Sequence, residues 1–321
     1  MKTELFSKEI SNWDGWAAVF QSIDDFLPLI EEIRRRESLP EGAIEHVTPG
    51  TNAVFASGSL IYKIYVPLTS SEKASTEFET ERFSLHFAQA ARVSSPQIIA
   101  AGALQDRYLF RYFVLSRLQG REAGGVLKTL SDAEKQRFVS ELKKILAALN
   151  RPLPAGHPLS PAFCAGEGRD WDIFPPRILQ ELQSGNDWIP EADRGPGCYV
   201  HGDLTAENVL LSAEGLPLLI DFADSREAPS CYELSPLLFD LFDLDPVLLR
   251  LFCGTGDPVR LADSAFAGML LHEFGASFAE ILCSRLLDCK PDQLHSLSQL
   301  REALRSYFSR CCRVPGTKNQ A

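Results

Sequence analysis

The stretch that decides the fold is residues 199–225, YVHGDLTAENVLLSAEGLPLLIDFADS. It contains two short apolar runs, VLL at 209–211 and PLLI at 217–220, and the pair Glu214-Gly215 between them is a turn signal. The stretch therefore predicts a hairpin of two short buried strands. Because a hairpin places the start of one strand beside the end of the other, polar residues just outside the two strands should come together.

Carboxylate and carboxamide side chains flank this hairpin. Asp203 and Asn208 precede the first strand and Asp221 follows the second, so we expect the three side chains to converge on one small volume. Hard oxygen ligands of this kind suit Mg²⁺, which takes few protein ligands and keeps waters and substrate phosphates. One Asp can hold the metal while the other orients or deprotonates a hydroxyl group, which is the division of labour in phosphoryl transfer.

Composition is that of a globular protein large enough for two lobes. The 321 residues can bury a large core, and 45% of them are hydrophobic and 23% charged. No apolar run is long enough to span a membrane, and the charged N-terminal segment does not fit a signal peptide. The eight cysteines form no C-x-x-C pair, so we expect reduced thiols in a cytoplasmic protein. A net charge of −11 argues against a nucleic-acid partner and is compatible with a cationic small molecule.

The N-terminal part of the chain predicts a helix followed by strands. Residues 13–37 carry apolar residues at helical spacing, and we expect this helix to pack on the back of a lobe. Strands are predicted at 43–47, 53–56 and 60–66. The turn at 48–52 could present its main-chain N–H groups to phosphate oxygens.

Lys63 stands out because it lies inside the apolar third strand, LIYKIYV. A buried ammonium group needs a partner, and the alternative is an edge-strand lysine that extends to water. The next segment, residues 71–91, predicts a helix that offers three glutamates as partners. They are Glu77, Glu79 and Glu81.

The rest of the chain adds two strands and a set of helices. Strands are predicted at 96–102 and 108–118, a capped helix at 131–149 and a loop rich in Pro, Gly and Ala at 151–168. More helices follow the hairpin, and the motif HEF at 272–274 falls in the middle of the third of them. These predicted helices are 232–245, 246–253, 264–288 and 291–312.

The pattern H-x-D-x-x-x-x-N at 201–208, followed by Asp221-Phe222, resembles the catalytic and metal segments of the protein-kinase-like superfamily. His-Gly-Asp, with no Asp-Phe-Gly, resembles its aminoglycoside phosphotransferase and choline-kinase family. The order of turn, strand lysine, helix glutamate, hinge and HGD…N…D is similar to that family over residues 45–245. Segments similar to hygromycin phosphotransferases lie at 51–52, 112–117, 200–204, 220–224 and 271–274.

The resemblance implies an α+β, protein-kinase-like fold with two lobes. Residues 1–115 would form an N-terminal nucleotide-binding lobe with an antiparallel sheet. Residues 116–321 would form a mainly helical C-terminal lobe with the catalytic and acceptor sites. The resemblance also implies ATP, or alternatively GTP, as phosphoryl donor, Mg²⁺ as cofactor, and a small-molecule hydroxyl as acceptor.

Residue roles in the nucleotide-binding lobe follow from the same resemblance. Lys63 would contact the α- and β-phosphates, and Glu81 would orient it. Asn52 belongs to the turn that faces the phosphates, and the main chain near Ser116 and Leu118 would bind adenine. Because the sequence does not fix the helix register, the neighbouring Glu77 stays open as the partner of the lysine.

Residue roles in the catalytic lobe are implied in the same way. Asp203 would be the general base or orient the hydroxyl, Asn208 and Asp221 would hold Mg²⁺, and His201 would be structural. Carboxylates are also expected around a cationic acceptor. The candidates are Asp224, Glu227, Glu233 and Glu273.

One segment departs from the family pattern. Tyr232-Glu233-Leu234 stands where many relatives carry Asp-Leu, which weakens the prediction of an anchor for the catalytic loop.

We therefore expect a kinase for a hydroxyl group of an aminoglycoside or aminocyclitol antibiotic such as hygromycin, an activity that confers antibiotic resistance. A metabolic acceptor, such as an amino alcohol, a sugar or a ketosamine, is the alternative. A nucleotide-binding pseudokinase would lack one of Asp203, Asn208 and Asp221, and all three are present. A protein kinase is disfavoured because the chain lacks Asp-Phe-Gly.

Overall fold

The structure, a computed structural model, describes residues 4–67, 73–184, 188–194 and 196–312. The chain divides into two compact units. Unit 1 comprises residues 1–90 and 94–119, and unit 2 comprises residues 91–93 and 120–321.

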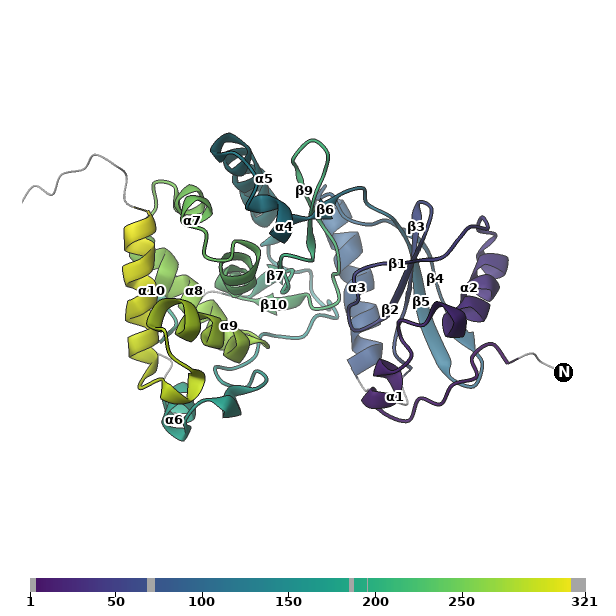
Figure 1. The fold of residues 1–321 in the computed structure, drawn as a ribbon, viewed down its shortest axis with the longest axis horizontal. Helices are drawn as coiled ribbons and strands as arrows, with labels where there is room; N and C mark the ends of the chain where they lie inside the picture. The colour runs from purple at the N-terminus through teal and green to yellow at the C-terminus, as the bar shows by residue number, and fades with distance from the viewer. Residues whose placement is uncertain (1–3, 68–72, 185–187, 195, 313–321) are drawn as a thin grey trace, which may run out of the picture. The chain divides into compact units, whose positions relative to one another are not determined.

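Unit 1 is built on one antiparallel sheet with the strand order β1-β2-β3-β5-β4 (Figure 1). In the middle strand, Lys63 pairs with Val54 on one side and with Phe113 on the other, so it does not lie at an edge. All the predicted strands are therefore confirmed, most of them with slightly different ends. The strands are β1 Glu45–His46, β2 Ala53–Ser57, β3 Leu60–Ile64, β4 Ile98–Gln105 and β5 Leu109–Ser116.

The predicted N-terminal helix is divided into α1 (Trp13–Ala17) and α2 (Ile23–Glu37). The division occurs because Ser22 has extended backbone and caps α2, its side chain accepting a hydrogen bond from the N–H of Asp25 at 3.3 Å. The apolar face of α2 packs on one face of the sheet, as expected (Figure 1). The buried residues of α2 in this core are Phe26, Leu29, Ile30 and Ile33.

The other face of the sheet is covered by α3 (Lys73–Ala90), as Figure 1 shows. The ring of Phe78 on this helix stacks on Phe113 of β5, with centroids 4.3 Å apart and an interplanar angle of 8°. Tyr65 meets both rings edge-on. This aromatic cluster fixes the helix against the sheet and thereby sets which of its glutamates face the strand lysine.

Unit 2 contains the predicted hairpin, formed by β8 (Val209–Leu211) and β9 (Pro217–Leu219). A third strand, β6 (Arg121–Glu122), pairs with β8. A second small sheet pairs β7 (Cys198–Val200) with β10 (Arg226–Ala228), and so joins the two ends of the decisive stretch. The hairpin prediction is confirmed.

Helices form most of the remainder of unit 2 (Figure 1). Their bounds are α4 Ala123–Leu127, α5 Asp132–Leu149, α6 Pro176–Ser184, α7 Pro246–Cys253, α8 Pro258–Leu271, α9 Gly275–Leu282 and α10 Leu297–Cys311. Short 3₁₀ turns lie at Trp171–Ile173, Glu191–Asp193, Ser230–Glu233 and Pro291–Gln293, and wide π-type turns at Pro236–Leu241 and Cys283–Leu287. Ser131 and Glu134 form a capping box at the start of α5, as the capped helix predicted.

The prediction of one helix over 264–288 is wrong. Helix α8 starts earlier, at Pro258, and ends before His272, whose backbone is extended at φ −84° and ψ 145°. Helix α9 then begins at Gly275, where a side chain would collide with the carbonyl oxygen of Met269. The motif HEF at 272–274 therefore lies at a break between two helices rather than in the middle of one.

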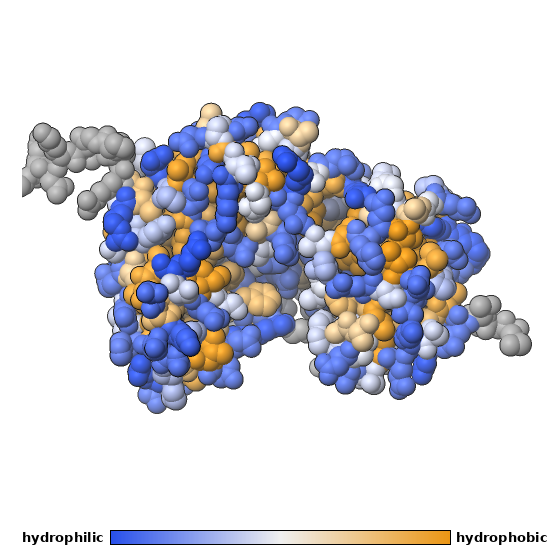
Figure 2. All heavy atoms as spheres, viewed as in Figure 1, coloured by the Kyte–Doolittle hydropathy of each residue, from blue (hydrophilic) through white to orange (hydrophobic). Residues whose placement is uncertain are grey.

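Polar residues cover most of the surface that is visible in Figure 2. Within the described residues, we find no helix with both the length and the apolar character that membrane crossing requires.

Candidate active site

In unit 1, Lys63 and Glu81 form a buried ion pair. Their side chains are held on β3 and α3, with Nζ 2.6 Å from Oε2, and the residues are only 4% and 1% exposed. The hydroxyl of Tyr65 donates a second, short hydrogen bond to the same carboxylate. The lysine is thus a buried, paired cation and not a residue that extends to water. Glu79 instead contacts Arg82 and Arg111.

The turn before β2 ends at Asn52, which is buried. Its Oδ1 atom has no hydrogen-bond partner among the described residues, although a buried amide oxygen normally has one. The preceding carbonyl, of Thr51, accepts a hydrogen bond from Nε1 of Trp16 at 2.8 Å. An unsatisfied buried acceptor beside a loop expected to face phosphates fits a ligand that brings donors, such as a hydrated cation.

The predicted adenine-binding segment lies at the end of β5. The N–H of Ser116 already donates to the carbonyl of Gln97 at 2.9 Å, and the N–H of Arg117 donates to Ser59 at 2.8 Å. These two donors are therefore engaged within unit 1. Of the two residues expected to bind adenine, Leu118 is the one with no such main-chain donor bond within the part of the chain that the structure describes.

In unit 2, the hairpin brings Asp203, Asn208 and Asp221 together. Nδ2 of Asn208 donates to Oδ2 of Asp203 at 2.5 Å and to its carbonyl oxygen at 3.2 Å. The main-chain carbonyl of Asn208 accepts from the N–H of Ile220 at 3.0 Å, which places Asp221 next to it. Asp221 has a positive φ of 56°, unusual for a residue other than glycine and typical of functional turns.

Negative charge gathers around Asp203. Burial raises its pKa well above the usual value, and the carboxylates of Asp224, Asp221 and Asp240 raise it further, against the opposing hydrogen bond from Asn208. Mutual repulsion of this kind is relieved when a cation binds. Among the described residues no three Asp, Glu, His or Cys side chains form a ready-made metal site. One carboxylate and one carboxamide nevertheless fit Mg²⁺, which keeps most of its waters.

Glu233 anchors the loop that carries Asp203. Its carboxylate accepts hydrogen bonds from the N–H groups of His201 and Gly202, the latter at 3.2 Å. The residue is 1% exposed, and burial raises its pKa to about 7 even though these hydrogen bonds and one from Asn150 oppose the shift. The catalytic loop therefore has an anchor, Glu233, although the departure of this segment from the family pattern had weakened that prediction. Because its carboxylate is buried and holds the loop, Glu233 is not available to an acceptor.

Glu273 also differs from its expected place at the acceptor site. It is buried between two guanidinium groups, 2.6 Å from Arg169 and 2.8 Å from Arg226. Its N–H donates to the hydroxyl of Tyr232 at 3.3 Å. With both carboxylate oxygens paired to arginines, Glu273 stabilises unit 2 and is unsuited to hold a ligand.

Two of the four acceptor candidates retain solvent exposure. Asp224 is half-buried and close enough to Asp203 to raise its pKa. Glu227 lies on β10 with its side chain 40% exposed, and Nε2 of His157 is 3.4 Å from its carboxylate. These two carboxylates are the ones that an acceptor could reach.

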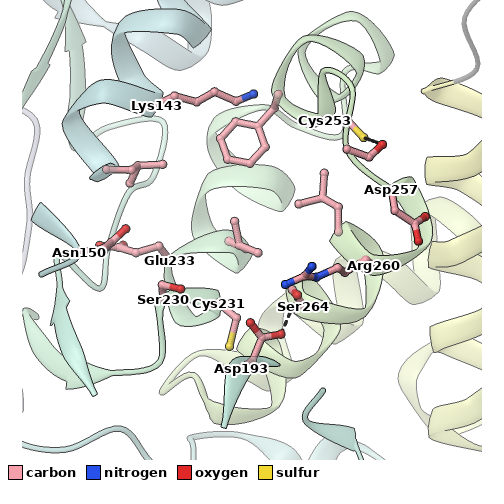
Figure 3. A pocket seen from close by; sticks show the side chains of 15 residues that line it. Lys143, Asn150, Asp193, Ser230, Cys231, Glu233, Cys253, Asp257, Arg260 and Ser264 are labelled. Carbon is pink, nitrogen blue, oxygen red and sulfur yellow. Dashed lines mark hydrogen bonds between the residues drawn. The ribbon is translucent and has the colours of Figure 1, made fainter. Parts of the chain in front are cut away.

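A pocket of about 490 Å³ lies between α5, α7 and α8, behind the loop anchor (Figure 3). Asn150 and Glu233 lie side by side at one end of it, and its walls include apolar side chains such as Leu146 and Phe252. Sequence reasoning did not identify Asn150, whose Nδ2 donates to the carbonyl of Tyr199 at 3.0 Å. In the sequence, the one feature that could have pointed to Asn150 is its position directly after the predicted helix 131–149.

Asp240 also belongs to this site, although sequence reasoning counted it only among the acidic residues that follow the hairpin. Its carboxylate accepts a hydrogen bond from the N–H of Ala206 at 2.7 Å and adds negative charge near Asp203. The available signal was a lone aspartate within the apolar run PLLFDLF at 236–242.

Comparisons with known proteins agree with this architecture. A family model described as the phosphotransferase enzyme family matches residues 52–263. A search of curated proteins found no match. The fold is similar to that of a GDP and kanamycin complex of an aminoglycoside 2″-phosphotransferase of type IIIa, with a TM-score of 0.60 and 18% identity, covering 88% of this chain and 99% of that one.

Two further solved structures share the fold. An ADP-bound aminoglycoside phosphotransferase APH(2″)-Ib has a TM-score of 0.53 and 16% identity, covering 87% of this chain and 98% of that one. A streptomycin–ATP complex of APH(2″)-IIa has a TM-score of 0.52 and 16% identity, covering 82% and 96%. The fold is thus protein-kinase-like, as the sequence predicted. The family match spans more than half of the chain, so this protein belongs to the phosphotransferase enzyme family.

Proposed function

We propose that the protein transfers the γ-phosphoryl group of ATP, or of GTP, to a hydroxyl group of a small cationic molecule. The observation that carries the proposal is the cluster in unit 2, where Asp203 is bonded to Asn208 and surrounded by further carboxylates. We take an aminoglycoside or aminocyclitol antibiotic, with hygromycin as one example, as the first acceptor class, and antibiotic resistance in the cytoplasm as its role.

Asp203 is the group we assign to the acceptor hydroxyl. Its raised pKa makes the carboxylate a better proton acceptor than a solvated aspartate, and the bond from Asn208 holds its orientation. The proton of the acceptor hydroxyl passes to a carboxylate oxygen of Asp203 as the hydroxyl oxygen bonds to the γ-phosphorus. The bond between that phosphorus and the oxygen bridging to the β-phosphate breaks, and the nucleoside diphosphate leaves. Asn208 and Asp221 would hold Mg²⁺, which supplies charge neutralisation for the transferred group.

Residues of unit 1 are assigned to the nucleotide. We propose that Lys63 contacts the α- and β-phosphates, since Glu81 holds its ammonium group in a buried position. The turn ending at Asn52 would lie along the phosphates. The main chain at Leu118 and the carbonyl oxygen of Ser116 would bind the base of the nucleotide.

The acceptor class is supported by charge. Asp224 and Glu227 are half-exposed carboxylates in unit 2, and the protein carries a net charge of −11. Carboxylates attract protonated amino groups and raise the rate of encounter with a polycation. The solved relatives named for kanamycin and streptomycin bind acceptors of this chemistry, which supports the same class here.

The test is nucleotide consumption by the purified protein with Mg²⁺, with ATP and with GTP. The acceptor panel holds hygromycin, other aminoglycosides, amino alcohols and sugars, and Asp203→Asn is the matched control. We expect an acceptor-dependent rate with an aminoglycoside that the variant lacks. A rate only with an amino alcohol or a sugar would replace the antibiotic by a metabolic acceptor. A rate that persists in Asp203→Asn would overturn the role of this residue.

A further inference from the structure

His272 lies at the break between α8 and α9, at a position that the proposed chemistry does not use. It is 1% exposed, although an imidazole is more often half-exposed. Its ring stacks on Tyr232, with centroids 4.3 Å apart and an angle of 26°, and meets the ring of Phe278 edge-on at 5.1 Å. Two aromatic rings therefore pack against the imidazole.

The hydrogen bonds of His272 define its tautomer. Nδ1 accepts the N–H of Phe274 at 3.1 Å, so this nitrogen carries no proton. The proton of the neutral ring is then on Nε2, which donates to the carbonyl oxygen of Gly202 at 2.8 Å. Burial lowers the pKa of His272 to about 4, so the ring is neutral near pH 7.

The peptide that His272 holds is the one that enters Asp203. At its other end, the N–H of Asp203 donates to Nδ1 of His201 at 3.3 Å. Nε2 of His201 faces the carbonyl of Ile220 at 3.2 Å, which requires the proton on that nitrogen. Two imidazoles therefore hold the C=O and the N–H of one planar peptide unit, and a planar unit held at both ends fixes the Cα atom that follows.

This peptide needs external support because it follows glycine. Gly202 has a φ of +84°, and a side chain there would collide with the carbonyl oxygen of Asp224. Glycine alone permits this conformation but does not enforce it. Glu233 holds the N–H on one side of Gly202, and His272 holds the carbonyl on the other.

We propose that His272 is a positioning residue for phosphoryl transfer: its neutral Nε2–H fixes the Gly202 carbonyl and so sets the position of the Asp203 carboxylate. The proposal rests on the proposed function, because the position of this carboxylate affects the rate only if Asp203 is the group that takes the proton of the acceptor. Shifts of about 1 Å in a reacting group change rates by roughly 100-fold. The loss of this one hydrogen bond should therefore lower kcat by a much larger factor than it changes the KM of the nucleotide.

Two variants of His272 separate the hydrogen bond from the packing. His272→Phe keeps an aromatic ring against Tyr232 but has no donor for Gly202. His272→Gln keeps an N–H at nearly the same distance along the side chain. Phe278→Leu is the matched control, because it loosens the packing of the His272 ring and leaves the hydrogen bond in place.

We expect kcat to fall roughly 10- to 100-fold in His272→Phe, with the nucleotide KM changed less than about threefold. His272→Gln should recover at least about fivefold of this loss, and Phe278→Leu should keep kcat within about threefold of the wild type. Equal rates in the Phe and Gln variants, or a wild-type kcat in His272→Phe, would overturn the proposal.

A second readout works without any acceptor. Amide hydrogen exchange over residues 199–206 should be about 10-fold or more faster in His272→Phe than in the wild type, and partly restored in His272→Gln. Unchanged exchange in His272→Phe would overturn the clamp itself. If the wild type transfers phosphate to no acceptor, the proposed function fails, whereas this exchange measurement still decides whether His272 holds the loop.

Discussion

The buried pair of Lys63 and Glu81 makes a quantitative prediction about unit 1. Replacing Lys63 by Met keeps the shape of the side chain but leaves a buried carboxylate without its cation. Removing one partner of a buried pair costs about 3–5 kcal/mol, because the remaining charge is uncompensated. Tyr65 still donates to Glu81, so we take the lower end, about 3 kcal/mol.

The double variant Lys63→Met/Glu81→Gln should be more stable than this single variant. It carries no charge at either of these two buried positions, and the Gln carbonyl can still accept the hydrogen bond of Tyr65. We therefore expect the second substitution to recover about 2 kcal/mol of the loss, which is the coupling energy of the pair. Glu81→Gln alone should be destabilising, because it removes the carboxylate that balances the charge of the buried lysine.

The assay is unfolding without nucleotide, followed by heat and by urea for the four proteins of this cycle. A loss of about 3 kcal/mol in a unit of this size corresponds to a fall of roughly 10 °C in the melting temperature. Arg82→Met, next to Glu81 on an exposed part of α3, is the matched control and should change stability by less than about 0.5 kcal/mol. Additive single effects would refute the reasoning, since independent charges have no coupling.

Three further predictions concern unit 2. Asp221→Asn keeps a residue that tolerates the positive φ, and it should weaken Mg·ATP binding by at least roughly 10-fold in a calorimetric titration; unchanged affinity would exclude Asp221 as a ligand. The pKa of Glu233 is raised from 4.5 to about 7, so the folded protein favours the protonated form of this side chain. About 3 kcal/mol of folding stability is therefore present below pH 4.5 and is lost as the pH rises through 7. Urea unfolding should show this loss between pH 5 and 8 in the wild type and not in Glu233→Gln. Gly202→Ala should cost at least about 2 kcal/mol in a thermal melt and abolish transfer, and a wild-type melting temperature would contradict the clash with Asp224.

The sequence predicted the features that depend on neighbours in the chain. The hairpin needs only two apolar runs and a turn, and its register then places Asn208 beside the residues that follow β9. Most strands of unit 1 followed from their apolar pattern, and so did the capped helix α5. A buried Lys63 could be inferred from its apolar neighbours, because an ammonium group in that setting needs a partner.

The features that depend on packing between distant segments could not be predicted. The choice of Glu81 as partner depends on the register of α3, which the stacking of Phe78 on Phe113 sets. The break at His272 was hidden because apolar residues continue at helical spacing on both sides of it, and only the close approach of Gly275 to Met269 reveals it.

The roles of the acidic residues were obscured in the same way. Glu233 and Glu273 look like Asp224 and Glu227 in the sequence, since all four are carboxylates that follow the hairpin. Their burial and their partners distinguish them: the first two are occupied with the loop and with arginines, and the last two keep solvent exposure. A carboxylate can anchor a backbone, balance a cation or attract a substrate, and the surrounding atoms decide which.

The N-terminal segment has a consequence for where this protein can be cut. The family match begins at residue 52, yet Phe6, Trp16 and Phe26 are all buried against the sheet, and Arg34 donates to Ser57 and to the carbonyl of Gly42, each at 2.8 Å. A protein that starts at residue 52 would expose this face of the sheet. We expect it to self-associate more than the 321-residue protein does in sedimentation experiments. The folding unit is therefore larger than the family unit, and a boundary taken from sequence similarity alone would remove part of the core.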